Sequence, residues 1–476
     1  MVGLGKRNLL VALALLTAGT ALAVAPVKDR RPNMIFILID DQRHDVIGSM
    51  GAFPWLKTPN LDKLAEEGAH FRNAFCTSSL CGPSRASFLT GTWPNRHGVV
   101  VNETNDYDPK LKNFSEVLQE AGYTTAYFGK WHQAQHGRPR PGFDHWVSFF
   151  GQGKYYNCVL NINGKKQKID TYLTDELNDR AVEYIKRDHE KPFLMYLSHK
   201  AMHEPFTPPE RHKDLYKGIA MRSRDNPADD IAAKPEWIAS QMREKRNGKP
   251  VAPVNRPAAM MDMMRTVSAV DEGLGRIVDQ LKEQGILDNT IIIYAGDNGY
   301  LLGEHGGTND KRKAYEPSIR IPLVMRYPKL AKPGSKIDEL VVNADLAPTL
   351  IELAGGKVPD EVQGESWLPL FKGKAGRDSF FYEYYQENDY RPHSGFGGTP
   401  TIHCVRGKRW KYMSYPDLPN EIEELYDMEN DPGELQNLAL NPECRTQLAA
   451  MRSKLEEHKK ALDFKMPIRL RDSEDD

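Results

Sequence analysis

The chain has 476 residues, of which 40% are hydrophobic and 27% are charged, as is usual for folded globular proteins. Its formal net charge at pH 7 is −1, so no overall basic field attracts nucleic acid or acidic lipid, and we expect no nucleic-acid partner. An anionic ligand would have to be held by local charges.

The first 23 residues are predicted to be a signal peptide. A basic pair, Lys6 and Arg7, precedes an apolar run (8–25) rich in small residues, with a cleavage site after Ala23. A membrane anchor is the alternative, but the run is short for a span. We therefore expect an exported protein, periplasmic or secreted, with no stable membrane insertion after cleavage.

Export would permit disulfides. Apart from Cys81, discussed below, four cysteines could pair in three ways or remain free thiols: Cys76, Cys158, Cys404 and Cys444.

Short apolar runs alternate with helical patterns along most of the chain. Runs rich in Ile, Val, Phe and Tyr predict strands buried on both faces, at 34–39, 124–129, 192–198, 290–296 and 322–327. Apolar residues at helical spacing predict helices at 59–69, 114–123, 173–188 and 265–285. The alternation predicts an α/β fold: a large mixed, mostly parallel sheet with helices on both faces. The polar residues 218–258 are predicted to be a surface insertion.

Near residue 375 the pattern changes. Short strands are predicted at 378–386, 401–407 and 409–415, followed by a last helix from about 442 to 462. We therefore expect a large domain over 24–375 and a smaller C-terminal α+β domain, with a short antiparallel sheet, over 376–476.

Polar side chains follow four of the predicted strands at the point where each strand ends. They are Asp40 and Asp41, Lys130 and His132, His199 and His203, and Asp297 and Asn298. Asp and Asn favour such turns for backbone reasons alone. Four polar strand ends in one sheet nevertheless favour a ligand site, because ligands of open α/β sheets bind beyond the carboxyl ends of the strands. The oxygen ligands indicate Ca²⁺ or Mg²⁺ rather than structural zinc.

Cys81 is predicted to lie at the N-terminus of a helix, because Pro83 suits a first helical turn. Arg85 lies one turn further on the same face and adds a fixed cation. This arrangement suits a thiolate nucleophile, or an oxygen nucleophile attacking a sulfate or phosphate ester. A buried structural cysteine is the alternative, and it leaves Arg85 and the oxygen ligands unexplained.

The stretch Cys81-Gly82-Pro83-Ser84-Arg85, continuing through ASFLTG, resembles the signature of the type I sulfatases, the formylglycine-dependent family of the alkaline phosphatase-like superfamily. Further stretches resemble that family in its own order: LIDDQR (38–43), GKWH (129–132), HEP (203–205), GDNGYLLGEHG (296–306), DKRKAYEPSIRIPLV (310–324) and ELYDMENDPGELQNL (424–438). The resemblance therefore spans nearly the whole chain after the signal segment. It implies a sulfuric ester hydrolase.

The resemblance also implies roles for individual residues. Cys81 would be oxidised to formylglycine (3-oxoalanine) by a maturation enzyme, and its hydrate would be both the nucleophile and a metal ligand. The other implied roles are Ca²⁺ ligands (Asp40, Asp41, Asp297, Asn298), groups that hold the hydrate (Arg85, Lys130), a base (His132), and groups that contact the sulfate and help protonate the leaving alcohol (His203, Lys311). Lys313 competes with Lys311 for the last role.

The substrate is inferred from a narrower resemblance. Residues 142–166, 172–185 and 203–216 resemble the glucosamine-6-sulfatase branch, including bacterial members that desulfate mucin and heparan. Animal members differ, with Cys-Cys-Pro-Ser-Arg and Gly-Lys-Tyr where this chain has Cys-Gly-Pro-Ser-Arg and Gly-Lys-Trp-His. The resemblance implies an exo-acting 6-O-sulfatase on N-acetylglucosamine-6-sulfate termini of sulfated glycans.

Several aromatic residues and histidines could contact such a sugar. Trp146, Phe150, Tyr155 and Tyr156 could form an apolar wall for a pyranose ring, or could belong to the core. His393 and His403 of the smaller domain could reach the rim of the pocket and bond sugar hydroxyls.

Four other functions remain open from the sequence. Phosphonate monoester and phosphodiester hydrolases share the modified cysteine and the metal site, and a sulfatase could act on another sugar position. A non-catalytic lectin-like protein would bind sulfated glycans without cleaving them. A transferase would move sulfate to a second sugar.

Overall fold

The computed structural model describes residues 31–102, 106–134, 137–221, 224, 226, 228–246, 257–307, 309–387 and 398–467. The predicted signal peptide and His393 lie outside the described residues. Within these ranges, no helix is long and apolar enough to cross a membrane.

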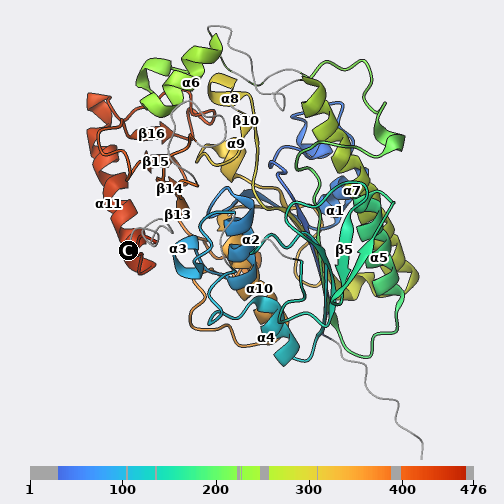
Figure 1. Ribbon diagram of the computed structural model, residues 1–476. Helices are drawn as coiled ribbons and strands as arrows, with labels where there is room; N and C mark the ends of the chain where they lie inside the picture. Colours follow the sequence, from blue (N-terminus) through green and yellow to red (C-terminus); the bar gives the residue numbers. More distant parts are fainter. Residues whose placement is uncertain are drawn as a thin grey trace, which may run out of the picture.

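A ten-stranded mixed sheet runs through the centre of the molecule (Figure 1). Its strands, in chain order, are β1 (Asn33–Ile39), β2 (Ala69–Phe75), β3 (Thr124–Gly129), β4 (His145–Phe149), β5 (Val159–Ile162), β6 (Lys165–Lys168), β7 (Phe193–Ser198), β8 (Thr290–Gly296), β11 (Leu323–Arg326) and β12 (Ser335–Val342). The spatial order is β12-β2-β11-β8-β1-β7-β3-β4-β5-β6, and the central run from β8 to β4 is parallel. The predicted fold class is confirmed.

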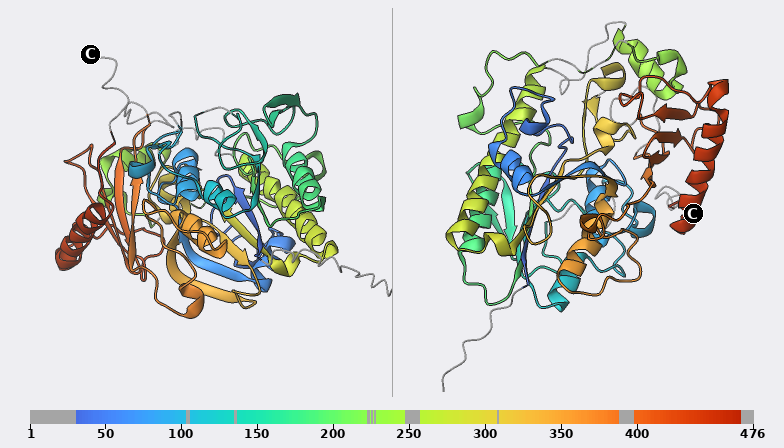
Figure 2. Two further views of the ribbon diagram at one scale, coloured as in Figure 1. Left: turned by 90° about the horizontal axis from the view of Figure 1, so that it is seen from below. Right: turned by 180° about the vertical axis from the view of Figure 1, so that it is seen from behind.

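Helices cover both faces of this sheet (Figure 2). On one face lie α1 (Pro59–Glu67), α5 (Leu173–Lys186) and α7 (Pro257–Glu283), which share a core with residues such as Ile35 and Ile37 of β1. On the other lie α2 (Cys81–Thr90), α4 (Phe114–Glu120) and α10 (Leu346–Leu353), with Phe36 and Leu38. Alternate residues of β1 thus enter different cores, which explains why the strand is apolar throughout.

The C-terminal region forms a separate antiparallel sheet. Its strands follow one another as β13 (Ser379–Tyr384), β14 (Ile402–Gly407), β15 (Trp410–Ser414) and β16 (Glu424–Asp427), and α11 (Arg445–Ala461) packs along its outer side (Figures 1 and 2). The three predicted strands and the last helix are confirmed, whereas β16 was not predicted. Short elements complete the described chain: α3 (Pro94–His97), α6 (Glu236–Arg246), α8 (Glu304–Gly307), α9 (Glu316–Ile319) and the ribbon of β9 (Leu301–Leu302) and β10 (Asn309–Asp310).

The prediction of a surface insertion at 218–258 is wrong for part of that segment. Trp237, at the start of α6, is buried and packs against Tyr415 with ring centroids 5.7 Å apart. Lys234 is fully buried and donates to the hydroxyl of Tyr426 and the carbonyl of Glu434. The segment is polar on average, but a few large apolar side chains and one paired lysine suffice to dock it on the smaller sheet.

Candidate active site

The four polar strand ends meet at the carboxyl edge of the central sheet, as the sequence predicts. Asp40 follows β1, Lys130 follows β3, His199 follows β7 and Asp297 follows β8, and all four are buried. The approach of β3 to β7 requires Gly129, because a Cβ there would lie 1.8 Å from the carbonyl oxygen of Ser198.

Cys81 is the first residue of α2 and is fully buried beside these groups. Its Sγ lies 3.4 Å from Asp40 Oδ1 and 2.7 Å from Lys311 Nζ. Burial, with Asp40 next in importance, raises the pKa of the thiol to about 12. An unmodified Cys81 is therefore a poor thiolate nucleophile, despite its place at a helix N-terminus.

Three carboxylates cluster against the cysteine. Oxygen atoms of Asp40, Asp41 and Asp297 all lie within 4.8 Å of one another. Burial, followed by the charge of Asp40, raises the pKa of Asp297 to about 7. Such a set of buried acids is costly without a cation to balance it.

Asn298 gives an independent indication of a cation. Its Nδ2 donates to Asp41 Oδ1 and to the carbonyl of Gly299, each at 2.8 Å, whereas its Oδ1 is buried and has no hydrogen-bond partner among the described residues. A buried carbonyl oxygen beside three carboxylates fits the ligand set of a hard divalent ion such as Ca²⁺. The residues present therefore fit the predicted metal.

Two buried cations hold the carboxylates in place. Arg85 donates through Nε to Asp297 Oδ2 at 2.9 Å and through Nη1 to Ser198 Oγ at 2.6 Å, while Lys130 Nζ donates to Asp40. Burial would raise the pKa of Asp40, but Lys130, His203 and Arg85 hold it well below its ordinary value. In this structure Arg85 thus contacts the carboxylates of Asp297 and Asp40, and Asp40 in turn contacts Cys81.

His132 is buried next to this cluster and adopts a left-handed backbone conformation, with φ of 58°. Its Nε2 lies 3.1 Å from Gln152 Nε2, and its Nδ1 is buried with no hydrogen-bond partner within the described ranges. Burial and the nearby Lys130 hold the pKa of the imidazole well below its ordinary value. The ring is therefore neutral at pH 7 and can accept a proton. Sequence reasoning missed Gln152, and no local motif marks it.

His203 reaches the same cluster from the segment after β7. Its ring, Asp40 and Cys81 offer ligand atoms within 4.8 Å of one another, and its Nε2 lies 3.9 Å from Asp41 Oδ2. Its Nδ1 lies 2.9 Å from the carbonyl oxygen of Glu204. Because a carbonyl only accepts, Nδ1 carries a proton and Nε2 faces the cluster.

The structure distinguishes the two candidate lysines. Lys311 Nζ lies beside Cys81 Sγ and donates to Asp41 Oδ1. Burial alone would lower the pKa of Lys311, but Asp41 and Cys81 raise it well above its ordinary value, so its charge is retained. Lys313 is also buried, yet the charges that act on it are those of Asp310 and Arg312. Lys311 is the lysine placed at the candidate nucleophile.

The proposed aromatic wall divides into two groups. Trp146 and Tyr155 are buried, the first against Tyr127, with the two rings stacked 4.8 Å apart. Phe150 and Tyr156 remain 71% and 37% exposed, so only these two are available to a sugar.

His403 is not at a pocket rim. It is buried in β14 between Phe381 and Phe464, and neither ring nitrogen has a hydrogen-bond partner in the part of the chain that the structure describes. Burial lowers its pKa to about 3, which fits a neutral core histidine. The expectation that His403 reaches the sugar is therefore wrong.

All five cysteines are free thiols.

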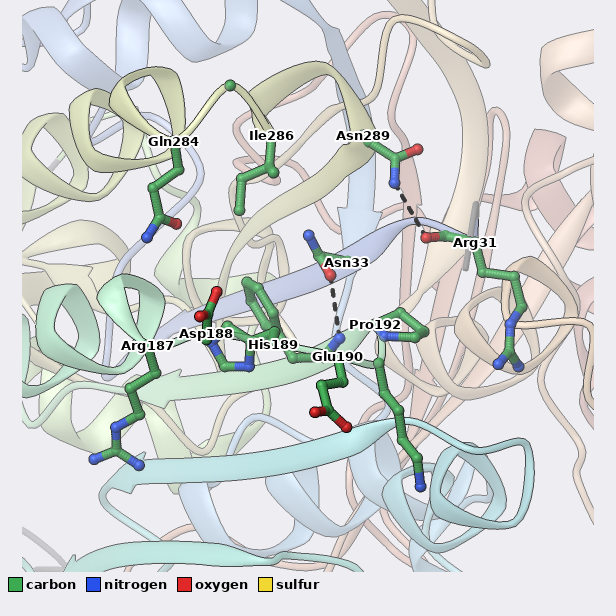
Figure 3. A pocket seen from close by; sticks show the side chains of 13 residues that line it. Arg31, Asn33, Arg187, Asp188, His189, Glu190, Pro192, Gln284, Ile286 and Asn289 are labelled. Carbon is green, nitrogen blue, oxygen red and sulfur yellow. Dashed lines mark hydrogen bonds between the residues drawn. The ribbon is translucent and has the colours of Figure 1, made fainter. Parts of the chain in front are cut away.

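A separate cavity of about 460 Å³ opens at the opposite, amino-terminal edge of the sheet (Figure 3). Its lining includes Asn33 at the start of β1 and Pro192 just before β7, and it contains none of the candidate site residues. The side chains drawn in Figure 3 include both acidic and basic groups, such as Glu190 and Arg187.

Comparison with known proteins agrees with this geometry. The sulfatase family model matches residues 32–356, and the model described as N-sulphoglucosamine sulphohydrolase, C-terminal, matches residues 303–461. An N-acetylglucosamine-6-O-sulfatase of Bacteroides thetaiotaomicron is 31% identical over 95% of this chain and 90% of its own. The N-acetylglucosamine-6-sulfatase of Homo sapiens is 31% identical over 79% of this chain and 72% of its own.

A similar fold has also been solved with a sugar bound. The chain superimposes with a TM-score of 0.82 and 30% identity, over 92% of this chain and 99% of the other, on a protein in complex with its substrate D-glucosamine-2-N,6-O-disulfate.

Proposed function

The chain belongs to the sulfatase family, and on this basis we propose that it removes 6-O-sulfate from N-acetylglucosamine-6-sulfate at the ends of exported sulfated glycans. Membership of the family makes it a sulfuric ester hydrolase. The sugar and the sulfate position are supported by two relatives that are named N-acetylglucosamine-6-sulfatases and that match this chain over most of their own length. Export is supported by the predicted signal segment.

The observation that carries the proposal is the place of Cys81. It is the first residue of α2, it lies against Asp40, and Lys311 Nζ is 2.7 Å from its sulfur. Burial raises the pKa of the thiol, which disfavours the thiolate, and conversion to formylglycine would supply an oxygen nucleophile instead. After oxidation to formylglycine, the aldehyde hydrate at Cys81 would supply one hydroxyl for attack on sulfur and a second whose deprotonation releases sulfate.

The chain's own residues divide the remaining work. Asp40, Asp41, Asp297 and Asn298 would hold a Ca²⁺ ion, which supplies positive charge to the sulfate oxygens when bound. Lys311, charged and aimed at Cys81, would stabilise the negative charge that grows on those oxygens in the transition state. Arg85 and Lys130 hold the carboxylates of Asp297 and Asp40 in place through hydrogen bonds.

Two histidines would move the protons. His132 is neutral, so its imidazole suits the base that takes the proton of the second hydroxyl. His203 presents Nε2 toward the cluster while Glu204 fixes its other nitrogen, which suits a group that contacts the leaving oxygen. His393, the remaining predicted sugar contact, lies outside the described residues and stays a proposal.

The test is desulfation of a panel of sulfated sugars by the purified protein, with chromatography of the products. We expect N-acetylglucosamine-6-sulfate to be the best substrate, and 4-O- and 2-O-sulfated sugars to be poor ones. Preference for a galactose sulfate or a 2-O-sulfated uronic acid would overturn the substrate assignment and leave the sulfatase chemistry intact. A phenyl phosphonate offered beside phenyl sulfate would reveal a phosphonate hydrolase, and sulfate on a second sugar would reveal a transferase.

A further inference from the structure

The segment 199–207 carries His203 across the carboxyl edge of the sheet, and its first half is fixed by main-chain hydrogen bonds. Asp40 donates its N–H to the carbonyl of Ala201 at 2.8 Å, and the N–H of Met202 donates to the carbonyl of Asp40 at 2.6 Å. The segment thereby continues the pairing of β1 with β7 up to the residue before His203.

From His203 to residue 209 the chain forms no helix or strand, and side chains from elsewhere hold it. Three side chains donate to main-chain carbonyls of this segment: Tyr155 Oη to that of His203 at 2.8 Å, Lys200 Nζ to that of Glu204 at 2.8 Å, and Tyr172 Oη to that of Thr207 at 3.0 Å. We call these donors, Tyr155, Lys200 and Tyr172, the carbonyl clamp.

The carbonyl clamp is itself rigid. The rings of Tyr155 and Tyr172 are stacked, with centroids 5.6 Å apart and planes inclined by 9°. Lys200 Nζ lies 5.1 Å from the centroid of the Tyr155 ring, and all three side chains are at least 95% buried. The N–H of Leu173 also donates to the carbonyl of Tyr155 at 2.7 Å, which ties the clamp to the start of α5.

We propose that the carbonyl clamp is a positioning device for His203, and this inference rests on the proposed function, in which His203 acts at the ester. Tyr155 fixes the main chain from which the imidazole projects. Lys200 fixes the carbonyl of Glu204, the same oxygen that accepts the Nδ1–H of His203. Tyr155 therefore fixes the main chain at His203 and Lys200 fixes the orientation of the ring, so that Nε2 faces Asp41.

The consequence is a defined effect on catalysis. A misplacement of about 1 Å in a catalytic group can cost roughly 100-fold in rate. A sugar alcohol needs a proton as it leaves, which His203 would give from Nε2 after that nitrogen is protonated in the substrate complex, whereas p-nitrophenolate is stable as an anion. A less well positioned His203 should therefore slow the release of a sugar far more than the release of nitrophenol. Partial unfolding of the protein would instead lower both rates equally.

Tyr155→Phe is the sharpest variant, because it removes one hydroxyl and keeps the stacked ring. We expect kcat on N-acetylglucosamine-6-sulfate to fall about tenfold to hundredfold, and kcat on p-nitrophenyl sulfate to fall less than about threefold, with KM little changed. Tyr123→Phe is the matched control: its buried hydroxyl donates to the carbonyl of Pro32 at 3.0 Å, at the other end of the sheet. It should leave both substrates unaffected.

A double-mutant cycle decides whether the hydroxyl acts through His203. In a His203→Ala background, adding Tyr155→Phe should cost no further activity. An undiminished effect of Tyr155→Phe in that background would overturn the proposal, as would equal losses on both substrates.

A readout without turnover separates this inference from the proposed function. Hydrogen exchange in peptides covering 199–212 should be faster in Tyr155→Phe than in the wild type, and unchanged in Tyr123→Phe. Unchanged exchange in Tyr155→Phe would overturn the clamp even in an active enzyme. A wild-type protein that is inactive on both sulfate esters would instead refute the proposed function. The hydrogen-exchange experiment would still test the carbonyl clamp in that case.

Discussion

Lys311 Nζ lies 2.7 Å from the sulfur of Cys81, although 230 positions separate the two residues in the sequence. The contact joins the segment after β10 to the start of α2, two parts of the chain that the sequence relates only through family resemblance. It places a retained positive charge where a sulfate group must lie if Cys81 carries the nucleophile.

Removing the charge of Lys311 should lower activity far more than removing the charge of the neighbouring Lys313. We expect Lys311→Met to lower kcat/KM about 100-fold to 1,000-fold, as is typical for the loss of a group that stabilises transition-state charge. Lys313→Met, two residues away and also buried, should cost less than about tenfold. Initial rates on p-nitrophenyl sulfate, with thermal unfolding as a check on folding, measure both, and the reverse order would contradict the assignment.

Metal binding should depend on Asp297. In Asp297→Asn the isosteric amide removes one negative charge. The remaining carboxylates then repel one another less, but the site binds Ca²⁺ more weakly. We expect metal content to fall, and the rise in Tm on adding Ca²⁺ to shrink, because a ligand that binds the folded state raises stability by about 2.7 kcal/mol at 100 times its Kd.

Asp271→Asn is the control for that experiment, since Asp271 is a buried carboxylate that accepts N–H groups at the start of α1, away from the site. It should keep the full Ca²⁺ response. In the wild type, chelation should abolish activity and Ca²⁺ should restore it better than Zn²⁺. Full activity in metal-free protein would refute the metal assignment.

Stability should fall as the pH rises through the range in which Glu383 titrates. This carboxyl is buried in β13, where it accepts the N–H of Asn95 at 2.8 Å and the hydroxyl of Tyr385, and burial raises its pKa to about 7. The folded state thus binds the proton more tightly than the unfolded chain. The resulting stability is complete below about pH 4.5 and is lost by about pH 7, a change of about 3 kcal/mol.

Glu383→Gln should abolish that part of the pH dependence, because the amide mimics the protonated acid. The Tm of the variant, relative to that of the wild type, should therefore be higher at pH 8 than at pH 5. An equal difference at both pH values would show that Glu383 keeps an ordinary pKa.

The junction between the two sheets should depend on Lys411. This fully buried lysine of β15 contacts Glu434 and, at 3.3 Å, Glu316, which also accepts from Arg406 at 2.9 Å. Lys411→Met leaves buried carboxylates without their partner and should cost about 3–5 kcal/mol of stability. Lys408→Met, at a half-exposed pair with Glu339, should cost less than about 1 kcal/mol. Urea unfolding compares the two variants, and equal losses would contradict a special role for Lys411.

Much of the fold could be predicted because its central strands are apolar throughout. The structure places β3 and β8 at the residues predicted for them, 124–129 and 290–296. Of the strands that were not predicted, β2 and β12 lie toward one edge of the sheet, where exposed positions such as Arg72 interrupt the apolar pattern. The other unpredicted strands of this sheet, β4, β5 and β6, lie toward the opposite edge, and β6 is exposed throughout.

The site residues could be predicted where they lie at the ends of strands or within recognisable sequence motifs. The convergence of Asp40, Lys130 and Asp297 follows from the parallel sheet. Tyr155 and Gln152 were not assigned these contacts, because they act through single hydrogen bonds to distant residues. Lys200 was detectable in principle, as a lysine two residues beyond a fully buried strand.

The central claim is that Cys81 works only after oxidation to formylglycine. Peptide mass spectrometry across residues 78–91 of active, exported protein tests it most directly. We predict a mass lower than that of the cysteine peptide by the difference between CH₂SH and CHO, together with reaction of the peptide with a hydrazide. An unmodified thiol at Cys81 in fully active protein would contradict the account.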